Sequence, residues 1–402
     1  MSIDIRIENK EISTIICNDP DAEPGGTRPW LNVRGLFKNV DKKEWNDWLW
    51  QFKNSIRTVE KLTEVLTQNG IKISDKIQCA SEVFPLAITP YYLSLILDFS
   101  KDDPIYKMTI PSEEELVNPS FLSDDPLCEE RDCSVPNLVH RYKDRALLVS
   151  TNLCFSNCRH CTRKRVTDSK DYHLTPEELD NVIDYLKNHP EIKDVIISGG
   201  DPLTMSTDKL ENILKKLKSV ESLEIIRIGT RAPVTNPMRI TDELVSMISK
   251  YHPVWINTHF NHPQEITQES KNAVLKLVNA GIPVNNQNVL LKQVNDDSKV
   301  LIKLYKELLK IRVRPYYLFQ CDLVKGIEHF RTTIDKGIEI MENLRGRISG
   351  LGIPQYIVDS PEGRGKIPIL PSYIIGKENN KTILRNYKNE KIVYPDPTAG
   401  IL

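Results

Sequence analysis

The sequence lacks any run of about 18 or more apolar residues, so we expect no transmembrane helix. It also lacks the features of a secretory or transit signal, because its first residues, MSIDIRIENKEIST, contain acidic side chains and no apolar core preceded by basic residues. We therefore expect a cytoplasmic protein that does not bind membranes.

An excess of charge of either sign is absent as well, since 54 Lys and Arg against 55 Asp and Glu leave a net charge of −1. Nucleic-acid binding draws much of its affinity from an overall positive charge on the protein, which this chain lacks. We therefore expect no nucleic-acid partner. Apolar residues make up 40% and charged residues 27%, which is typical of a soluble globular protein and excludes wholesale disorder.

Cysteine is sparse, with 8 residues in 402. In a chain that is not exported, metal or redox chemistry explains cysteines better than disulfides do. Five are scattered and are interpreted as small, semi-buried apolar residues: Cys17, Cys79, Cys128, Cys133 and Cys321. The other three lie within one short segment.

The chain divides into four regions. Residues 1–37 form a polar tail, and residues 38–140 carry apolar side chains at the three- and four-residue spacing of helices. In residues 141–348, short β-rich runs alternate with amphipathic helices. Residues 349–402 form a Gly- and Pro-rich extension with strand-like YIVDS, SYIIG and TILRNY.

The third region predicts an α/β fold built as an open six-unit (β/α)6 partial barrel. Right-handed crossovers would curl the six units and place the reactive site at the carboxyl ends of the strands. Thr175 to Glu178 form a capping box with proline at the first helical position, and Thr241 begins another helix. The predicted strands are 146–151, 194–199, 224–229, 254–259, 284–291 and 312–319.

Cys154, Cys158 and Cys161 have the spacing C-x3-C-x2-C directly after the first predicted strand. A structural zinc site needs four ligands, and His160 would have to be the fourth, although adjacent residues rarely bind one ion. Three thiolates instead suit a four-iron, four-sulfur cluster whose fourth iron is free to bind substrate or cofactor. The spacing alone leaves both interpretations open.

This motif after the first barrel strand resembles the radical S-adenosylmethionine (SAM) enzymes. The resemblance implies that the open iron chelates SAM and that reductive cleavage releases a 5′-deoxyadenosyl radical. It also implies SAM-binding roles for Gly199, Gly200 and Asp201 in ISGGDPL, and for His259 and Gln287.

The segments HRYKDRALLVSTNLCFSNCRHCTRKR, YHPVWINTHFNHPQEIT and RVRPYYLFQCDL resemble the lysine 2,3-aminomutase family, and the similarity extends from about Trp45 to Tyr394. It implies an isomerase that couples SAM to pyridoxal phosphate. The radical abstracts a Cβ hydrogen from the imine of lysine with pyridoxal phosphate, and the amino group migrates to give β-lysine.

The resemblance assigns Lys366 in SPEGRGKIP as the pyridoxal phosphate lysine and Arg141 as a phosphate ligand. A lysine forms the resting imine with this cofactor, and a flexible loop lets its amine leave. Glu362 and Arg364 interrupt the glycine run that relatives have before this lysine.

Substrate binding is assigned in the same way to Arg163 for the carboxylate and to Asp322 and Asp359 for a distal ammonium. Two carboxylates that converge on one pocket repel each other unless a cation lies between them, which favours a cationic substrate. Two features depart from many relatives: Asp297 replaces a cysteine of an intersubunit zinc site, which we therefore do not expect, and Phe319 replaces a tyrosine.

L-lysine is the expected substrate, with an electron donor such as ferredoxin or flavodoxin and a homo-oligomeric state. One alternative is the same chemistry on ornithine, arginine or protein-bound lysine. The other is a non-catalytic iron–sulfur or zinc protein.

Overall fold

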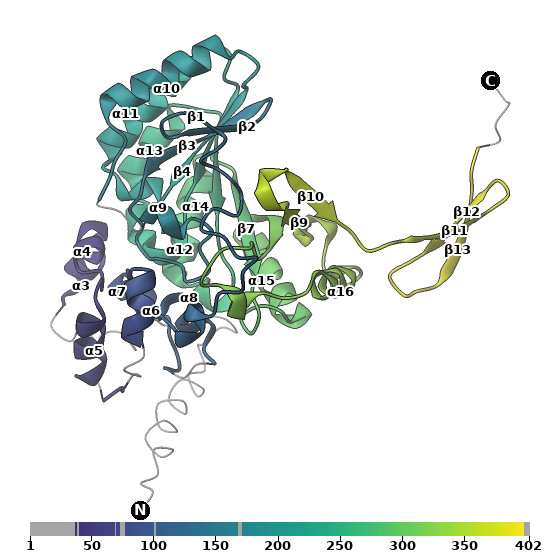
Figure 1. Ribbon diagram of the computed structural model, residues 1–402, viewed down its shortest axis with the longest axis horizontal. Helices are drawn as coiled ribbons and strands as arrows, with labels where there is room; N and C mark the ends of the chain where they lie inside the picture. The colour runs from purple at the N-terminus through teal and green to yellow at the C-terminus, as the bar shows by residue number, and fades with distance from the viewer. Residues whose placement is uncertain are drawn as a thin grey trace, which may run out of the picture.

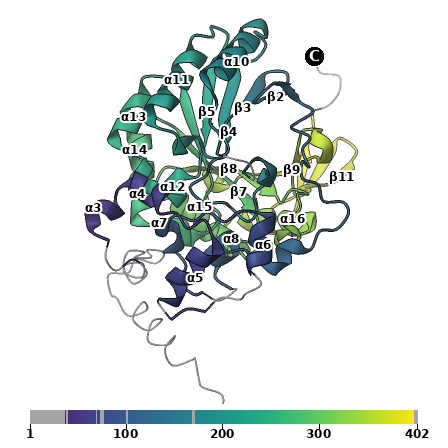
Figure 2. The same ribbon diagram turned by 60° about the vertical axis from the view of Figure 1, so that its left-hand side comes forward.

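The computed structural model describes residues 37, 40–68, 70–72, 77–99, 102–167 and 171–397. One curved sheet with helices on its outer side forms the body (Figures 1 and 2). A separate three-stranded sheet extends away from the body toward the carboxyl end (Figure 1). The predicted tail of residues 1–37 lies outside the described residues except for Phe37.

The main sheet has ten strands that are hydrogen-bonded in chain order, and its central strands β3 to β9 are parallel. Neighbouring parallel strands that follow each other in sequence are the product of βα units with the same hand. All six predicted strands are confirmed. Their bounds are β3 Arg145–Thr151, β4 Asp194–Gly199, β5 Ile225–Gly229, β6 Val254–Thr258, β7 Val284–Leu290 and β8 Arg314–Gln320.

The sheet continues beyond the predicted end of the barrel at residue 348. Strand β9 (Gln355–Asp359) pairs in parallel with β8, and β10 (Lys366–Ile369) pairs antiparallel with β9. YIVDS was expected in a separate extension, which is corrected here: Tyr356 is fully buried against α16 (Ile334–Leu344) and its hydroxyl donates to Gln320 Oε1 at 2.6 Å.

The opposite edge also differs from the expectation that residues 38–140 are helical. Strands β1 (Cys133–Val135) and β2 (Leu138–Tyr142) extend the sheet antiparallel from β3. Strand β1 has only three residues, too few for periodicity to distinguish it from a loop. Because β1 and β10 end the strand order, the sheet is open, which confirms the predicted partial barrel.

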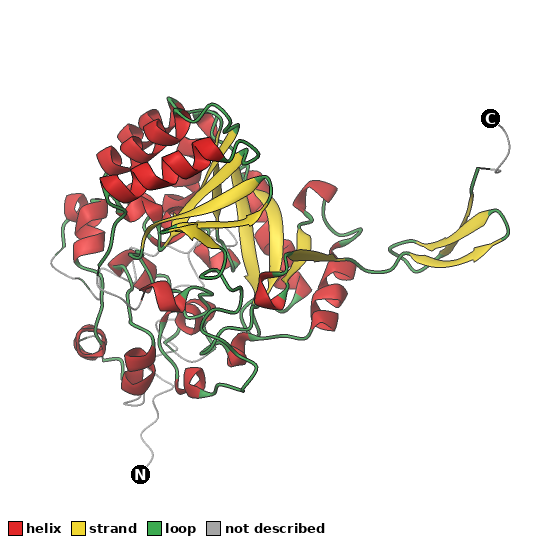
Figure 3. Cartoon of the chain, turned by 45° about the horizontal axis from the view of Figure 1, so that its top comes forward, coloured by secondary structure: helices red, strands yellow, loops and turns green. Residues whose placement is uncertain are grey.

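Helices cover the outer side of the sheet (Figure 3). The predicted capping box is present: Thr175 and Glu178 cap each other at the start of α10, and Thr241 caps α13. The α-helices are α3 Lys42–Trp45, α4 Trp48–Lys53, α5 Val59–Thr67, α6 Ile77–Val83, α7 Pro90–Leu93, α8 Pro104–Thr109, α9 Lys164–Thr167, α10 Pro176–Asn188, α11 Thr207–Lys218, α12 Ala232–Thr235, α13 Asp242–Ser249, α14 Gln268–Asn279, α15 Ser298–Lys310 and α16.

Short 3-10 turns and the separate sheet complete the secondary structure. The 3-10 turns are η1 Glu113–Leu116, η2 Pro202–Thr204, η3 Pro237–Arg239, η4 Pro263–Glu265, η5 Glu328–Phe330, η6 Gly350–Gly352 and η7 Pro361–Gly363, and the separate sheet contains β11 Ile374–Glu378, β12 Lys381–Arg385 and β13 Lys391–Pro395. None of the helices in the described ranges is long and apolar enough to span a membrane.

Strand alternation decides which side chains enter the core and which are free for chemistry. In β4, Val195 and Ile197 are fully buried under the helices, whereas Asp194, Ile196 and Ser198 line a cavity on the inner side. Burying each aliphatic side chain stabilises the fold by about 1.5–3 kcal/mol. In β4 the side chains on the outer face therefore stabilise the fold, and those on the inner face line the cavity.

Candidate functional site

A cavity of about 410 Å³ lies on the inner side of the sheet and is lined by residues of β2 to β10 and of the loops between them. It brings together residues that are more than 200 positions apart in the chain. Seven of the predicted site residues line it: Arg141, Arg163, His259, Gln287, Asp322, Asp359 and Lys366. The three cysteines, Gly199, Gly200 and Asp201 are not part of its lining.

Lys366 and Asp359 face each other across the antiparallel pair of β9 and β10, where they are register partners. The Lys366 Nζ donates to both carboxylate oxygens of Asp359 at 2.6 and 2.7 Å. It also lies 4.7 Å from the ring centroid of Phe319, within the range of a cation–π contact. An ammonium group therefore already occupies the side of the cavity where Asp359 was predicted to bind one.

Asp322 is the second carboxylate on this side, and its Oδ2 accepts a hydrogen bond from Thr162 Oγ1 at 2.7 Å. Burial, and after it the negative charge of Asp359, raise the pKa of Asp322 to about 6 against the opposing effects of Thr162, Lys366 and Arg163. The two acids thus interact through their charges, and a cation placed between them favours the ionised form of Asp322.

The loop before Lys366 shows how the interrupted glycine run is accommodated. Gly363 and Gly365 have φ of +68° and +101°, and a Cβ at Gly363 would meet the carbonyl oxygen of Leu127 at 2.3 Å. Glu362 takes the left-handed conformation too, at φ 61°, at a cost of order 1 kcal/mol. Arg364 pairs with Glu362 at the surface, and neither side chain lines the cavity.

Arg163 is held by Glu129, a residue that the sequence analysis did not identify. Arg163 Nε donates to both Glu129 oxygens at 3.0 and 2.9 Å, and Nη2 donates to Oε1 at 2.7 Å. Burial alone would raise the pKa of Glu129, but the charge and hydrogen bonds of Arg163 lower it to about 2. The side of the guanidinium formed by Nε and Nη2 is therefore taken, and Nη1 donates to Ser198 Oγ at 3.3 Å.

Arg141 is likewise bound to the protein. Its Nε donates to Asp132 at 2.7 Å and its Nη2 to the carbonyl oxygen of Leu127. Two further arginines line the cavity, Arg145 at the start of β3 and Arg227 in β5, and the sequence analysis missed both. Strand alternation could have identified them, because each lies at an inward-facing position beside buried neighbours.

The cysteine loop follows β3. Its three cysteines form no disulfide with one another, and each residue is partly exposed. Cys158 Sγ accepts a hydrogen bond from Arg231 Nη1 at 2.8 Å, and Cys161 Sγ accepts one from the backbone of Arg163 at 3.3 Å. Burial, and after it nearby negative charges that include Cys158, raise the pKa of Cys154 well above its usual value and that of Cys161 to about 11.

These thiols fit an iron–sulfur cluster better than a single metal ion. Within the described ranges no three His, Cys, Asp or Glu side chains converge as ligands of one ion. In a four-iron cluster each thiolate binds a different iron, so convergence on one point is not required. Arg231, which follows β5 and also pairs with Glu265 at 2.5 Å, adds a buried positive charge that favours anionic sulfur.

Gly199, Gly200 and Asp201 pack the end of β4 against the cysteine loop. A Cβ at Gly200 would lie 2.3 Å from the carbonyl oxygen of Leu153, so only glycine allows this approach. The buried carboxylate of Asp201 accepts hydrogen bonds from Thr230 Oγ1 at 2.6 Å and from the backbone of Arg231 at 2.8 Å. The predicted role of these residues in SAM binding stays a prediction.

Comparisons with known proteins agree with this arrangement. A family model described as "Radical SAM superfamily" matches residues 148–305, which contain the end of β3, the cysteine loop and β4 to β7. A second model, described as "Lysine-2,3-aminomutase", matches residues 341–401, which contain Asp359 and Lys366.

Among curated proteins, an L-lysine 2,3-aminomutase of Clostridium subterminale is 49% identical, with 90% of this chain and 87% of the relative covered. An L-lysine 2,3-aminomutase of Methanococcus maripaludis is 48% identical, covering 91% and 85%. A glutamate 2,3-aminomutase of Clostridioides difficile is 45% identical, covering 90% and 85%.

Proposed function

This chain belongs to the lysine 2,3-aminomutase family of radical SAM enzymes, and from that membership we propose that it converts L-lysine to β-lysine by moving the α-amino group to Cβ. The family makes the chain an isomerase, so the non-catalytic alternative is set aside. Membership leaves the substrate open, because the relatives include enzymes named for lysine and for glutamate at similar identity. The choice between them depends on the charges in the cavity.

The observation that carries the proposal is the pair of carboxylates Asp322 and Asp359, with an ammonium bound to one of them. Asp359 is 11% exposed and Asp322 is largely buried, so an anionic substrate side chain at this position would be repelled with little screening by water. A lysine side chain supplies the ammonium that both acids require. The two carboxylates would also bind the cationic side chains of ornithine and arginine, which differ from lysine in length and shape.

We assign the substrate carboxylate to Arg163. Because Glu129 occupies Nε and Nη2, the carboxylate is bound through Nη1, beside Ser198, rather than through the whole fork of the guanidinium. Arg163 at the carboxylate and the two aspartates at the distal ammonium would then fix the direction in which lysine lies. Fixing both ends places Cα and Cβ at one position and limits rotation about the bond between them.

The family implies SAM and a four-iron, four-sulfur cluster at Cys154, Cys158 and Cys161. We assign pyridoxal phosphate to the cavity, with Lys366 as its lysine and Arg141 and Arg145 beside its phosphate. When bound, SAM on the cluster supplies the radical and pyridoxal phosphate supplies a conjugated ring that carries the migrating amino group. Lys366 holds a proton at Nζ in its ion pair with Asp359, and it gives up that partner when it engages the cofactor.

This exchange accounts for the position of Lys366. While Lys366 is bound to Asp359, its ammonium occupies the place that the substrate ammonium needs. Once Lys366 turns to the cofactor, Asp359 is left as an 11% exposed carboxylate without a cation, which is unfavourable unless a new cation binds. Loading of the cofactor would thereby prepare the site for a cationic substrate.

The experiment is an assay of anaerobically reconstituted enzyme with L-lysine, L-glutamate, L-ornithine, L-arginine and a lysine-containing peptide as separate substrates. Chromatography that resolves α- from β-amino acids measures the product. We expect β-lysine to form with the highest kcat/KM. Preferential formation of β-glutamate would overturn the assignment of Asp322 and Asp359, and preference for ornithine, arginine or the peptide would overturn lysine as the substrate.

We further propose a small electron-transfer protein, such as ferredoxin or flavodoxin, as the reductant, a cytoplasmic location and a homo-oligomeric state. Exposed apolar side chains on the separate sheet support self-association, among them Ile374, Ile375, Val393 and Tyr394, each at least 49% exposed. Light scattering of the wild-type chain and of a chain truncated before residue 371 measures the oligomeric state directly. A wild-type chain that is monomeric would overturn the proposed homo-oligomeric state.

A further inference from the structure

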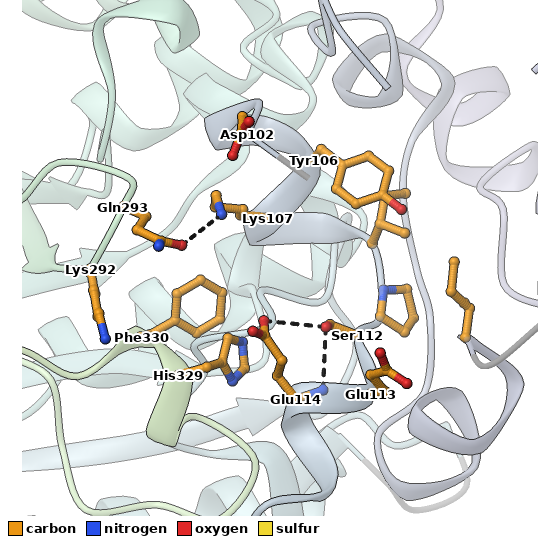
Figure 4. A pocket seen from close by; sticks show the side chains of 13 residues that line it. Asp102, Tyr106, Lys107, Ser112, Glu113, Glu114, Lys292, Gln293, His329 and Phe330 are labelled. Atoms are coloured by element: carbon orange, nitrogen blue, oxygen red, sulfur yellow. Dashed lines mark hydrogen bonds between the residues drawn. The ribbon is translucent and has the colours of Figure 1, made fainter. Parts of the chain in front are cut away.

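A second cavity, of about 220 Å³, is shown in Figure 4. Its lining comes from α6, α8, the segment that leads into η1, the loop after β7, and η5. It shares no lining residue with the cavity of about 410 Å³ that holds Lys366. The two cavities are therefore separate sites on the same chain.

Charges of both signs line this second cavity around an apolar wall. Lys107 Nζ donates to Gln293 Oε1 at 2.9 Å, whereas the ammonium of Lys292 has no partner among the described residues. Glu114 accepts a weak hydrogen bond from Ser112 at 3.4 Å. In Figure 4 the ring of Phe330 lies between Lys292 and Glu114, so cationic and anionic groups flank an apolar surface.

The cavity also contains an unsatisfied polar atom. Nδ1 of His329 is buried and has no hydrogen-bond partner in the described part of the chain. A buried polar atom without a partner costs about 1–3 kcal/mol. A movement of η5 that turned this atom toward the cavity would let a bound ligand recover that cost.

Three walls of the cavity touch the cysteine loop directly. The carbonyl oxygen of Met108 in α8 accepts from the backbone of Arg159 at 3.0 Å. In η1, Glu115 pairs with Arg159 at 2.7 Å and with Lys164 at 3.2 Å. In η5, Phe330 makes an edge contact with His160 at a centroid distance of 6.0 Å. A ligand that moves these walls would therefore alter the surroundings of Cys158 and Cys161.

We propose that this cavity binds one small zwitterionic amino acid and that the cysteine loop senses its binding. The carboxylate faces Lys107 and Lys292, and the ammonium faces Glu113 and Glu114. A phosphate-rich ligand would be repelled by the glutamates, and a lone cation by the lysines. The choice of amino acid rests on the proposed function: the substrate lysine and the product β-lysine share this chemistry and are both present around the enzyme.

Calorimetry on anaerobic holoenzyme tests the proposal, with L-lysine and β-lysine titrated separately. Wild-type protein should bind two equivalents of at least one of them per chain, and Lys292→Glu should lose one equivalent or weaken it at least tenfold. Lys299→Glu, an exposed charge reversal on α15, is the matched control and should bind like wild type. Asp322→Asn should lose the other equivalent, that of the catalytic cavity.

Spectroscopy of the reduced cluster provides the second readout. Addition of the amino acid that binds should change the electron paramagnetic resonance spectrum of Asp322→Asn, and the change should disappear in Lys292→Glu/Asp322→Asn. A spectrum of Asp322→Asn that does not change overturns the sensing role.

The outcomes separate this site from the proposed function. One equivalent that is lost in Asp322→Asn and kept in Lys292→Glu overturns the second site and leaves the proposed function intact. One equivalent with the opposite dependence supports the second site and overturns the role of Asp322. No binding of either amino acid overturns both.

Discussion

Replacing Glu129 tests whether the position of Arg163 depends on the carboxylate that holds its guanidinium. Glu129 is 8% exposed and accepts three hydrogen bonds from Arg163, so water cannot take over its role. A net hydrogen bond to a charged group is worth about 1.5–3 kcal/mol. Loss of this orientation should lower kcat/KM for lysine roughly 10- to 150-fold.

Two variants of Glu129 should lower kcat/KM for lysine to different extents. Glu129→Gln keeps the shape and one acceptor oxygen and should fall at the lower end of this range, whereas Glu129→Ala removes every contact and should fall at the upper end. The neighbouring Glu130→Gln is the matched control, because the Glu130 side chain is 79% exposed and, among the described residues, its carboxylate bonds to Arg165 alone. It should keep kcat/KM within about twofold, since exposed ion pairs contribute little.

A double-mutant cycle with Arg163→Gln supplies the decisive assay. If Glu129 acts through Arg163, the two losses in kcat/KM are not additive, and Glu129→Gln costs little once Arg163 is gone. Lysinamide, which lacks the substrate carboxylate, should show almost no effect of Glu129→Gln. Additive losses, or an equal loss with lysinamide, would refute the assignment and leave Glu129 as a residue that stabilises the fold.

Cys158→Ala should abolish cluster assembly and turnover while pyridoxal phosphate still binds, as measured by iron content and absorbance; normal iron content contradicts the assignment. Borohydride reduction of the holoenzyme followed by peptide mapping should label Lys366. Lys366→Ala should lose the label and the product, whereas the control Lys377→Ala should keep both. Labelling of another lysine would refute the assignment of Lys366 as the pyridoxal phosphate lysine. Because the pKa of Asp322 is raised to about 6, the carboxylate loses its charge as the pH falls through 6, so KM for lysine should rise below that pH. Asp322→Asn should have a higher KM that no longer changes near pH 6, and a variant that keeps the inflection shows that another group titrates there.

The order of the strands and the segments that carry the candidate functional residues could be predicted from the sequence. Alternating strands and amphipathic helices leave few topologies, since parallel neighbours need a right-handed crossover of a dozen or more residues. The six predicted strands and the loop that carries Cys154, Cys158 and Cys161 followed from such local patterns. Lys366 and the two aspartates came from resemblance to a family, because single charged residues carry no periodicity.

Only the tertiary structure decided which charged groups pair inside the barrel. Arg163 meets Glu129 from the amino-terminal region, and Arg231 meets Cys158 from a position 73 residues away. Such contacts depend on how the sheet curves and on where its short edge strands attach, and the short strands β1 and β2 carried too little local signal to be predicted. Burial then fixes the partners, because a charge withdrawn from water must find an opposite charge nearby. The register of β9 and β10, which places Lys366 on Asp359, is decided in the same way.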